Sequence, residues 1–244
     1  ILNLSIDLNN MNIKRFDNYS SMSSYGCQRS IDIIKKNPNS LLSVATGNST
    51  IGLYKEFKKY FIDNNNFFSK VRIVKLDEWL IGPETDKIGF CERYIKSNIL
   101  KPLNINLDRY ISFNANTNDP VLECRRVYEE LKKSGPIDLC ILGLGKNGHL
   151  GFIEPGAPLY IKPYVSELSV ESQNHGMLLN ENIIYERGLT LSINQILSSK
   201  KIIIFVSGEG KQNAKLELLS GKISTDCPAS FLWLHNDVEC LISN

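Results

Sequence analysis

Short runs of apolar residues alternate with amphipathic segments along most of the chain. A short apolar run bounded by turn residues is typical of a buried strand, whereas apolar residues that recur every three to four positions are typical of a helix. These patterns predict strands over residues 41–45, 71–76, 110–113, 137–141, 188–193, 201–206, 230–235 and 238–243. They predict helices over residues 21–36, 51–62, 88–99, 120–133 and 194–199, and one more helix that begins near Lys211.

The order of these elements predicts the fold class. Because strands and helices alternate over the whole chain, we expect a three-layer α/β/α fold with a mainly parallel, Rossmann-like sheet. The 244 residues contain no linker-like stretch, so we expect residues 1–244 to form a single domain that opens with a strand or arm. Periodicity fades over residues 157–187, where Pro158 and Pro163 lie, and we interpret this irregular stretch as a candidate lid over the site.

Composition argues against several classes of partner. A net charge of +2 gives no reason to expect a nucleic-acid or membrane partner, and no apolar run reaches the length of a membrane span. The first residues lack the charged and then apolar pattern of a secretory leader. The six cysteines are scattered without metal-ligand spacing, and several lie in apolar segments where a thiol acts as a small hydrophobic group. We therefore expect a cytoplasmic protein without a metal site.

The stretch richest in candidate chemistry follows the predicted strand over residues 137–141. Glycines at 143, 145, 148 and 151 allow sharp turns and a close approach to a ligand, and they present His149 and Glu154 beyond the carboxyl end of the strand. Open α/β sheets bind small molecules at that edge. The residues after Gly148 do not fit the helix of a dinucleotide-binding motif, so we expect no organic cofactor.

Three other polar junctions follow predicted strands, and each has a plainer alternative. The turn over residues 46–50 precedes a helix, where N–H groups and the helix dipole favour a phosphate, although its hydroxyls could merely cap that helix. Asp77 and Glu78 end another strand and could simply be solvated. Lys211 lies in the first turn of a predicted helix, where the helix dipole disfavours a cation by about 0.3–1 kcal/mol. Either Lys211 has a function there, or its side chain simply points into solvent. Since all these groups follow strands, we expect them to converge on one crevice.

These motifs resemble the glucosamine-6-phosphate deaminase family of amino-sugar phosphate isomerases. The resemblance rests on Gly143, Gly145, Gly148, His149 and the pair Glu154-Pro155. Asn147 stands where the glucosamine enzymes carry an aspartate, and the form Gly-Lys-Asn-Gly-His is similar to the galactosamine-6-phosphate branch. The Ser-Gly-Glu-Gly-Lys-Gln turn at 207–212 and the ending Pro-Ala-Ser-Phe-Leu-Trp-Leu-His at 228–235 resemble the same branch.

The resemblance implies a role for each candidate residue. Asp77 would be the base that removes the C2 proton, with Glu78 in support, and His149 would open the sugar ring while Glu154 orients its imidazole. Asn147 would fix the tautomer of that imidazole. The substrate would be a hexosamine 6-phosphate, and the products a ketohexose 6-phosphate and ammonia, without metal or cofactor. The implied substrate-binding residues are Thr46, Gly47, Asn48, Ser49, Thr50, Glu78, Gly145, Gly148 and Lys211.

Several alternatives remain at this stage. The family's phosphate-binding arginine has no counterpart within residues 166–182, and His175 is one candidate to replace it. His235 would be structural or lie at the rim of the pocket. The substrate could be glucosamine 6-phosphate, and the chain could form a homo-oligomer. A 6-phosphogluconolactonase is less consistent with Glu154-Pro155 and the Asp-Glu-Trp at 77–79, and a non-catalytic sugar-phosphate sensor would need a DNA-binding module that the sequence does not suggest.

Overall fold

The computed structural model describes residues 11–85, 87–178 and 185–243. The strands are β1 (Met11–Phe16), β2 (Leu41–Val44), β3 (Arg72–Lys75), β4 (Asp77–Trp79), β5 (Tyr110–Ile111), β6 (Leu139–Gly143), β7 (Tyr164–Glu167), β8 (Arg187–Thr190), β9 (Ile202–Val206) and β10 (Val238–Ser243). The α-helices are α1 (Tyr19–Lys36), α2 (Ile51–Asp63), α3 (Phe90–Ile95), α4 (Pro120–Ser134), α5 (Val170–Gln173), α6 (Ile193–Leu197) and α7 (Gln212–Leu219). A π-helical turn η2 (Lys96–Leu100) continues α3, and η3 (Leu107–Arg109), η4 (Gly176–Leu178) and η5 (Pro228–Leu234) are 3-10 helices.

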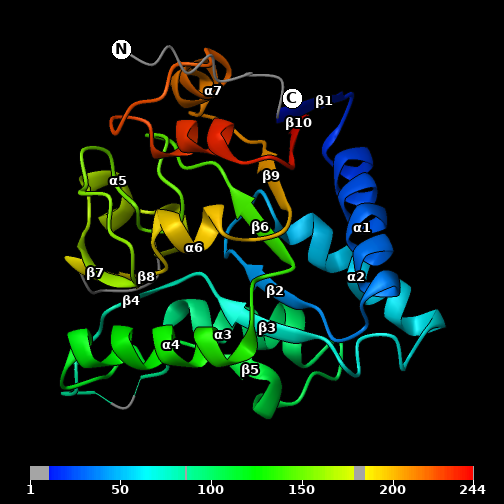
Figure 1. Cartoon of the computed structure of the whole chain (residues 1–244), viewed down its shortest axis with the longest axis horizontal. Helices are drawn as coiled ribbons and strands as arrows, with labels where there is room; N and C mark the ends of the chain where they lie inside the picture. Colours follow the sequence, from blue (N-terminus) through cyan, green and yellow to red (C-terminus); the bar gives the residue numbers. More distant parts are fainter. Residues whose placement is uncertain (1–10, 86, 179–184, 244) are drawn as a thin grey trace.

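A parallel sheet forms the centre of the molecule (Figure 1). Over the described residues it has seven strands in the order β1-β10-β9-β6-β2-β3-β5, and every neighbouring pair is parallel. One face packs against α1, α2 and the segment α3–η2, and the other face packs against α4, α6, α7 and η5. The prediction of a three-layer α/β/α fold with a mainly parallel sheet is therefore confirmed.

The central strand β6 shows why the apolar runs form this sheet. Leu139 and Ile141 belong to the hydrophobic cluster on the α1 and α2 side, whereas Cys140 and Leu142 belong to the cluster on the α4 and α6 side. All four residues are fully buried. A parallel strand that is covered on both faces needs apolar side chains at successive positions, which is why this segment is a continuous apolar run.

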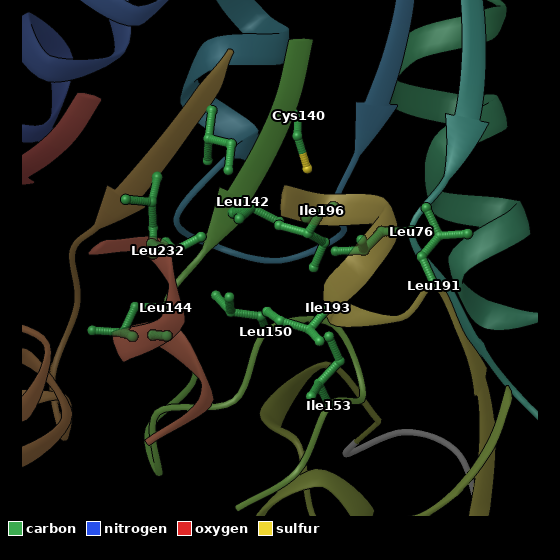
Figure 2. Packing of buried hydrophobic residues seen from close by; sticks show 14 of the residues in the cluster. Leu76, Cys140, Leu142, Leu144, Leu150, Ile153, Leu191, Ile193, Ile196 and Leu232 are labelled. Atoms are coloured by element: carbon green, nitrogen blue, oxygen red, sulfur yellow. The ribbon is translucent and has the colours of Figure 1, made fainter. Parts of the chain in front are cut away.

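Apolar residues also anchor the glycine-rich loop after β6 to the core (Figure 2). Leu144 lies near the start of the loop, and Leu150 and Ile153 are the neighbours in sequence of His149 and Glu154. All three apolar residues belong to the same cluster as Ile193 of α6. Burial of such a side chain contributes about 1.5–3 kcal/mol. The loop that carries the candidate chemistry is thus attached to the core at several points.

A small antiparallel sheet, in the order β4-β8-β7, lies beside the main sheet. The chain leaves the main sheet after β3, and Asp77 of β4 pairs with Thr190 of β8. We expected the segments around 77–79 and 188–193 within the alternation of a mainly parallel sheet, and the second sheet was not predicted. Periodicity identifies a strand without identifying its pairing partner.

Two other predictions need correction. Residues 230–235 are not a strand, since residues 228–234 form η5, in which Leu232 and Trp233 are buried. A short apolar run fits a buried helix as well as a buried strand, and Pro228 at the first position favours the helix. The stretch 157–187 is less irregular than expected, because it contains β7, α5 and η4; its residues 179–184 lie outside the described residues.

The described residues place limits on other features. No helix among them is long and apolar enough to cross a membrane. The same residues contain no cluster of three or more His, Cys, Asp and Glu side chains that could hold a metal ion. All six cysteines are buried and free.

Candidate active site

A cavity of about 480 Å³ lies at the carboxyl ends of β2, β3, β6 and β9. Its walls come from the turns after these four strands and from the segment that contains α5. The volume falls in the range of about 300–1,000 Å³ that small-molecule sites occupy. The predicted residues that line the cavity are Thr46, Gly47, Asn48, Ser49, Asp77, Gly145, His149 and Lys211.

Lys211 and Ser49 join two of these turns at one end of the cavity. Nζ of Lys211 donates a hydrogen bond of 2.7 Å to Oγ of Ser49, and Oγ of Ser49 lies 3.3 Å from the carbonyl oxygen of Ser207, to which it donates. Lys211 is the N-cap residue of α7 and is half-buried, so the alternative of a lysine directed into solvent is wrong. Burial, and then the charge of Lys146, lower the pKa of Lys211 to about 8.

The turn over residues 46–50 is held by groups that do not enter the cavity. Oγ1 of Thr50 donates to the carbonyl oxygen of Ala45 at 3.2 Å, and the Tyr19 hydroxyl donates to the carbonyl oxygen of Asn48 at 2.7 Å. Thr50, a predicted substrate-binding residue, is fully buried and is not among the residues that the structure brings to the cavity. Thr50 occupies the N-cap position of α2, but its side chain makes no capping bond there. The capping alternative is therefore wrong for Thr50, and Ser49 faces Lys211.

Asp77 lies at the floor of the cavity and is only 7% exposed. Burial, and then the nearby Glu78 carboxylate, raise the pKa of Asp77 to about 7, against the opposing effects of Lys75 and Cys91. Sγ of Cys91 lies 3.9 Å from Oδ1 of Asp77, which it faces as a thiol donor, and 3.4 Å from Oγ1 of Thr46. A carboxylate with a pKa near neutrality is suited to accept a proton and to return it.

Glu78 points away from the cavity into a buried ion-pair network. Its Oε2 accepts hydrogen bonds from Nζ of Lys75 at 2.8 Å and from the backbone N–H of Glu92 at 2.8 Å, and its Oε1 accepts from the N–H of Cys91 at 3.0 Å. The structure therefore does not bring the Glu78 carboxylate, which was predicted to contact substrate, to the cavity. Its supporting role is consistent with the structure, because these bonds fix the backbone beside Asp77 and hold the first turn of α3.

His149 lies over Gly145 in the loop after β6. A Cβ at Gly145 would lie 2.4 Å from Cδ2 of His149, so only glycine leaves room for the imidazole in this position. Nδ1 of His149 is 3.4 Å from Oγ of Ser172 and 3.7 Å from Oε2 of Glu154. Burial lowers the pKa of His149, and Glu154 opposes that effect, so the imidazole is neutral at neutral pH.

Asn147 and Glu154 lie behind His149, outside the cavity lining. Oδ1 of Asn147 accepts from the backbone N–H of His149 at 3.2 Å, and its Nδ2 donates to Oε2 of Glu154 at 3.1 Å. We expected the amide to accept from an imidazole N–H; it bonds the backbone and the carboxylate instead. Gly148 does not line the cavity either, and its φ of +87° lies in the left-handed region that the turn requires and glycine adopts readily.

The cavity also has lining residues that sequence reasoning missed. Lys146 lies beside the turn after β9, and Ser172 approaches the imidazole of His149 from the α5 segment. Lys146 stood inside the recognised loop, and its charge was the signal that could have identified it. Ser172 carried no such signal, because only the folded path of residues 164–178 brings it over the cavity.

The two other histidines have different positions. His175 lines the cavity near the Trp79 ring, and burial, with the charges of His149, Lys211 and Lys146, lowers its pKa to about 4. It is therefore neutral at neutral pH and does not supply the positive charge that an arginine would. His235 is buried away from the cavity, where its Nε2 lies 2.7 Å from the carbonyl oxygen of Ser199, so the structural interpretation holds and the rim interpretation is wrong.

Comparison with known proteins agrees with this geometry. A model of the family described as glucosamine-6-phosphate isomerases/6-phosphogluconolactonase matches residues 17–241. The chain is 37% identical over 231 residues to "Putative deaminase AgaI" of Escherichia coli strain K12, a match that covers 95% of this chain and 91% of that protein. It is 34% identical over 235 residues to glucosamine-6-phosphate deaminase 1 of Bacillus subtilis, with 95% of this chain and 96% of that protein covered.

The fold is also similar to that of solved structures. A monomeric glucosamine-6-phosphate deaminase superposes with a TM-score of 0.89 at 30% identity, covering 96% of this chain and 98% of that one. A 6-phosphogluconolactonase of Thermotoga maritima superposes with a TM-score of 0.75 at 15% identity, covering 96% of this chain and all (100%) of that one. The second similarity shows a shared fold alone.

Proposed function

Because the chain belongs to the family of glucosamine-6-phosphate isomerases and 6-phosphogluconolactonases, whose members are enzymes, we propose that it deaminates a hexosamine 6-phosphate, with galactosamine 6-phosphate as the favoured substrate. The observation that carries this proposal is the placement of Asp77 and His149 in one cavity whose other end carries Lys211 and Ser49. A phosphorylated sugar needs both a cationic end and a proton-transferring end.

In this proposal the phosphate binds at Lys211, Ser49 and the turn over residues 46–49. That remote binding orients the first two carbons of the sugar beside Asp77 and His149. The neutral imidazole of His149 moves a proton from the anomeric hydroxyl to the ring oxygen, which opens the pyranose to the aldehyde. Glu154 stabilises the imidazolium that forms during this transfer, and Asn147 holds Glu154 in place.

With the chain open, Asp77 removes the proton from C2, and the electron pair forms an enol-type intermediate between C1 and C2. Asp77 returns the proton to C1, and one hydrogen of the amine passes to the oxygen on C1, which leaves a hydroxyl at C1 and an imine at C2. Water adds to the imine carbon, the proton of the new hydroxyl passes to nitrogen, and the C–N bond breaks to release ammonia and leave the ketone. One hexosamine 6-phosphate and one water thus give one ketohexose 6-phosphate and one ammonia, and no electron is gained or lost overall.

The choice of galactosamine 6-phosphate rests on sequence resemblance. Residues 145–149, 207–212 and 228–235 are similar to the galactosamine branch. In the structure these three segments are neighbours, since the N–H of Ala229 in η5 donates to the carbonyl oxygen of Gly148 at 2.9 Å and Lys146 lies against Gly210. We further propose that the protein acts in the cytoplasm and that the stretch 157–187, which provides Ser172, acts as a lid.

The test is ammonium release from galactosamine 6-phosphate and glucosamine 6-phosphate, measured side by side with purified protein. We expect a larger kcat/KM with the galactosamine substrate. A larger value with glucosamine 6-phosphate would support deamination and contradict the branch. Hydrolysis of 6-phosphogluconolactone without ammonium release from either amino sugar would contradict the proposed reaction.

A further inference from the structure

Lys146 lies in the loop after β6, and its side chain extends to the turn after β9. A Cβ at Gly210 would lie 3.4 Å from Cε of Lys146 and 3.6 Å from its Nζ. Gly210 has a φ of +76° and leaves room for this contact. The ammonium group of Lys146 therefore stands beside the turn that carries Lys211, and both lysines line the cavity.

The charge of Lys146 acts on the ammonium group of Lys211. Burial is the main cause that lowers the pKa of Lys211 to about 8, and the charge of Lys146 is the next cause. The same charge contributes to the lowered pKa of His175. Two like charges at one end of a cavity are unfavourable unless an anion lies between them.

No carboxylate among the described residues neutralises this pair. Neither Lys146 nor Lys211 forms an ion pair within residues 11–85, 87–178 and 185–243. Glu171 and Glu209 also line the cavity, but neither reaches a lysine there within ion-pair distance in the described part of the chain. The Lys146 side chain is exposed, which leaves it able to close on a ligand.

The cavity offers few other cations for a phosphate. The described residues that line the cavity include two lysines, Lys146 and Lys211, and no arginine. The segment 164–178 over the cavity contains neither residue type. A phosphate monoester carries a charge of about −1.5 to −2 at neutral pH, more than Lys211 alone can balance.

We propose that Lys146 is the second phosphate-binding cation of this site, so that the phosphate lies between the ammonium groups of Lys146 and Lys211 and accepts a hydrogen bond from the hydroxyl of Ser49. This inference rests on the proposed function, because it assumes that a sugar phosphate is the substrate. It assigns to Lys146 a role that the resemblance does not give it. With Lys146 and Lys211 both on the phosphate, the segment 164–178 over the cavity does not need to supply a lysine or arginine.

Inorganic phosphate is the probe that separates this inference from the reaction itself. The rise in Tm with phosphate concentration, at constant ionic strength, measures phosphate binding to the folded protein without turnover. We expect Lys146→Met to weaken phosphate binding about tenfold or more, and Lys146→Arg to retain most of it. Lys132→Met is the matched control, because Lys132 is an exposed lysine on α4 outside the cavity, and it should bind phosphate like the wild type.

Steady-state kinetics with the sugar phosphate add a second readout. Loss of a contact that is equal in the ground and transition states raises KM and leaves kcat nearly unchanged. We therefore expect Lys146→Met to raise KM about tenfold with kcat within about threefold of the wild type. Phosphate binding by Lys146→Met within twofold of the wild type would overturn the inference, and so would a wild type that binds no phosphate. If phosphate binding depends on Lys146 but no amino sugar is deaminated, the inference stands and the proposed function fails.

Discussion

Oε2 of Glu154 lies 3.7 Å from Nδ1 of His149, and the other carboxylate oxygen, Oε1, is buried without a hydrogen-bond partner among the described residues. A carboxylate in this state is costly to bury, since one of its oxygens has lost water and gained no donor. The arrangement is therefore poor for stability and suited to catalysis, where the negative charge favours a protonated imidazole.

We predict that Glu154→Gln lowers kcat/KM about 10- to 100-fold while the protein unfolds at the same or a higher temperature. The amide keeps the shape of the side chain and removes the charge that opposes the lowering of the His149 pKa by burial. Steady-state kinetics and thermal unfolding of the same sample measure both effects. Glu167→Gln on β7 is the control, because Glu167 is exposed and does not line the cavity. A variant that loses stability but keeps its activity would contradict this account.

The pH dependence of kcat/KM should be bell-shaped and narrow. Asp77 must be ionised to act as a base, so activity should rise with pH through about 7. Lys211 must be protonated to bind phosphate, so activity should fall again above about 8. In kcat the alkaline limb should move to higher pH, because bound phosphate favours the charged lysine. Lys211→Arg should remove the alkaline limb, and a kcat/KM profile that is flat from about pH 6 to 9 would contradict both assignments.

The thiol of Cys91 should affect the pKa of the Asp77 carboxyl, the proposed base. Because its interaction with Asp77 lowers the pKa of that carboxyl, Cys91→Ala should move the acid limb of the kcat profile to higher pH. Cys91→Ser keeps a donor and should leave the limb close to its wild-type position. Cys124→Ala, which changes a buried cysteine outside the cavity, controls for the loss of packing. Equal acid limbs in wild type, Cys91→Ala and Cys91→Ser would show that the thiol does not act on Asp77.

Gly145 should tolerate no side chain. A methyl group there would displace the imidazole of His149, so Gly145→Ala should lower kcat about 100-fold or more. Gly176 offers a comparison within the same cavity, since a Cβ at that position would meet no atom within 4 Å. Gly176→Ala should therefore fold and retain far more activity than Gly145→Ala, and comparable kinetics for the two variants would refute the proposed position of the imidazole.

Much of the fold could be predicted because local pattern and global structure agree. The run around Leu139 and Ile141 is apolar at every position since β6 is buried on both faces, and the glycines that follow leave room for His149. Such features depend on residues that are adjacent in the sequence. For the same reason the convergence of Ser49, Asp77, His149 and Lys211 followed from their positions after strands.

What could not be predicted depends on partners distant in the sequence. Asp77 belongs to a second sheet because it pairs with Thr190, and no local pattern names that partner. Glu78 turns toward Lys75 and the first turn of α3, although its sequence position beside Asp77 suggested a substrate contact. The apolar run at 230–234 forms a helix because η5 fits against the core in that form, and its length alone does not distinguish the two.

The most direct test of the central claim is to follow galactosamine 6-phosphate by NMR in deuterated water, with wild-type protein and with Asp77→Asn. We predict that the wild type releases ammonium and forms a ketohexose 6-phosphate that carries solvent deuterium at C1, because Asp77 exchanges the C2 proton with solvent before it returns a hydrogen. The Asp77→Asn variant should bind phosphate as the wild type does. It should form ammonium and the ketohexose 6-phosphate far more slowly than the wild type. Full turnover by Asp77→Asn, or a wild type that leaves the amino sugar unchanged, would contradict the account.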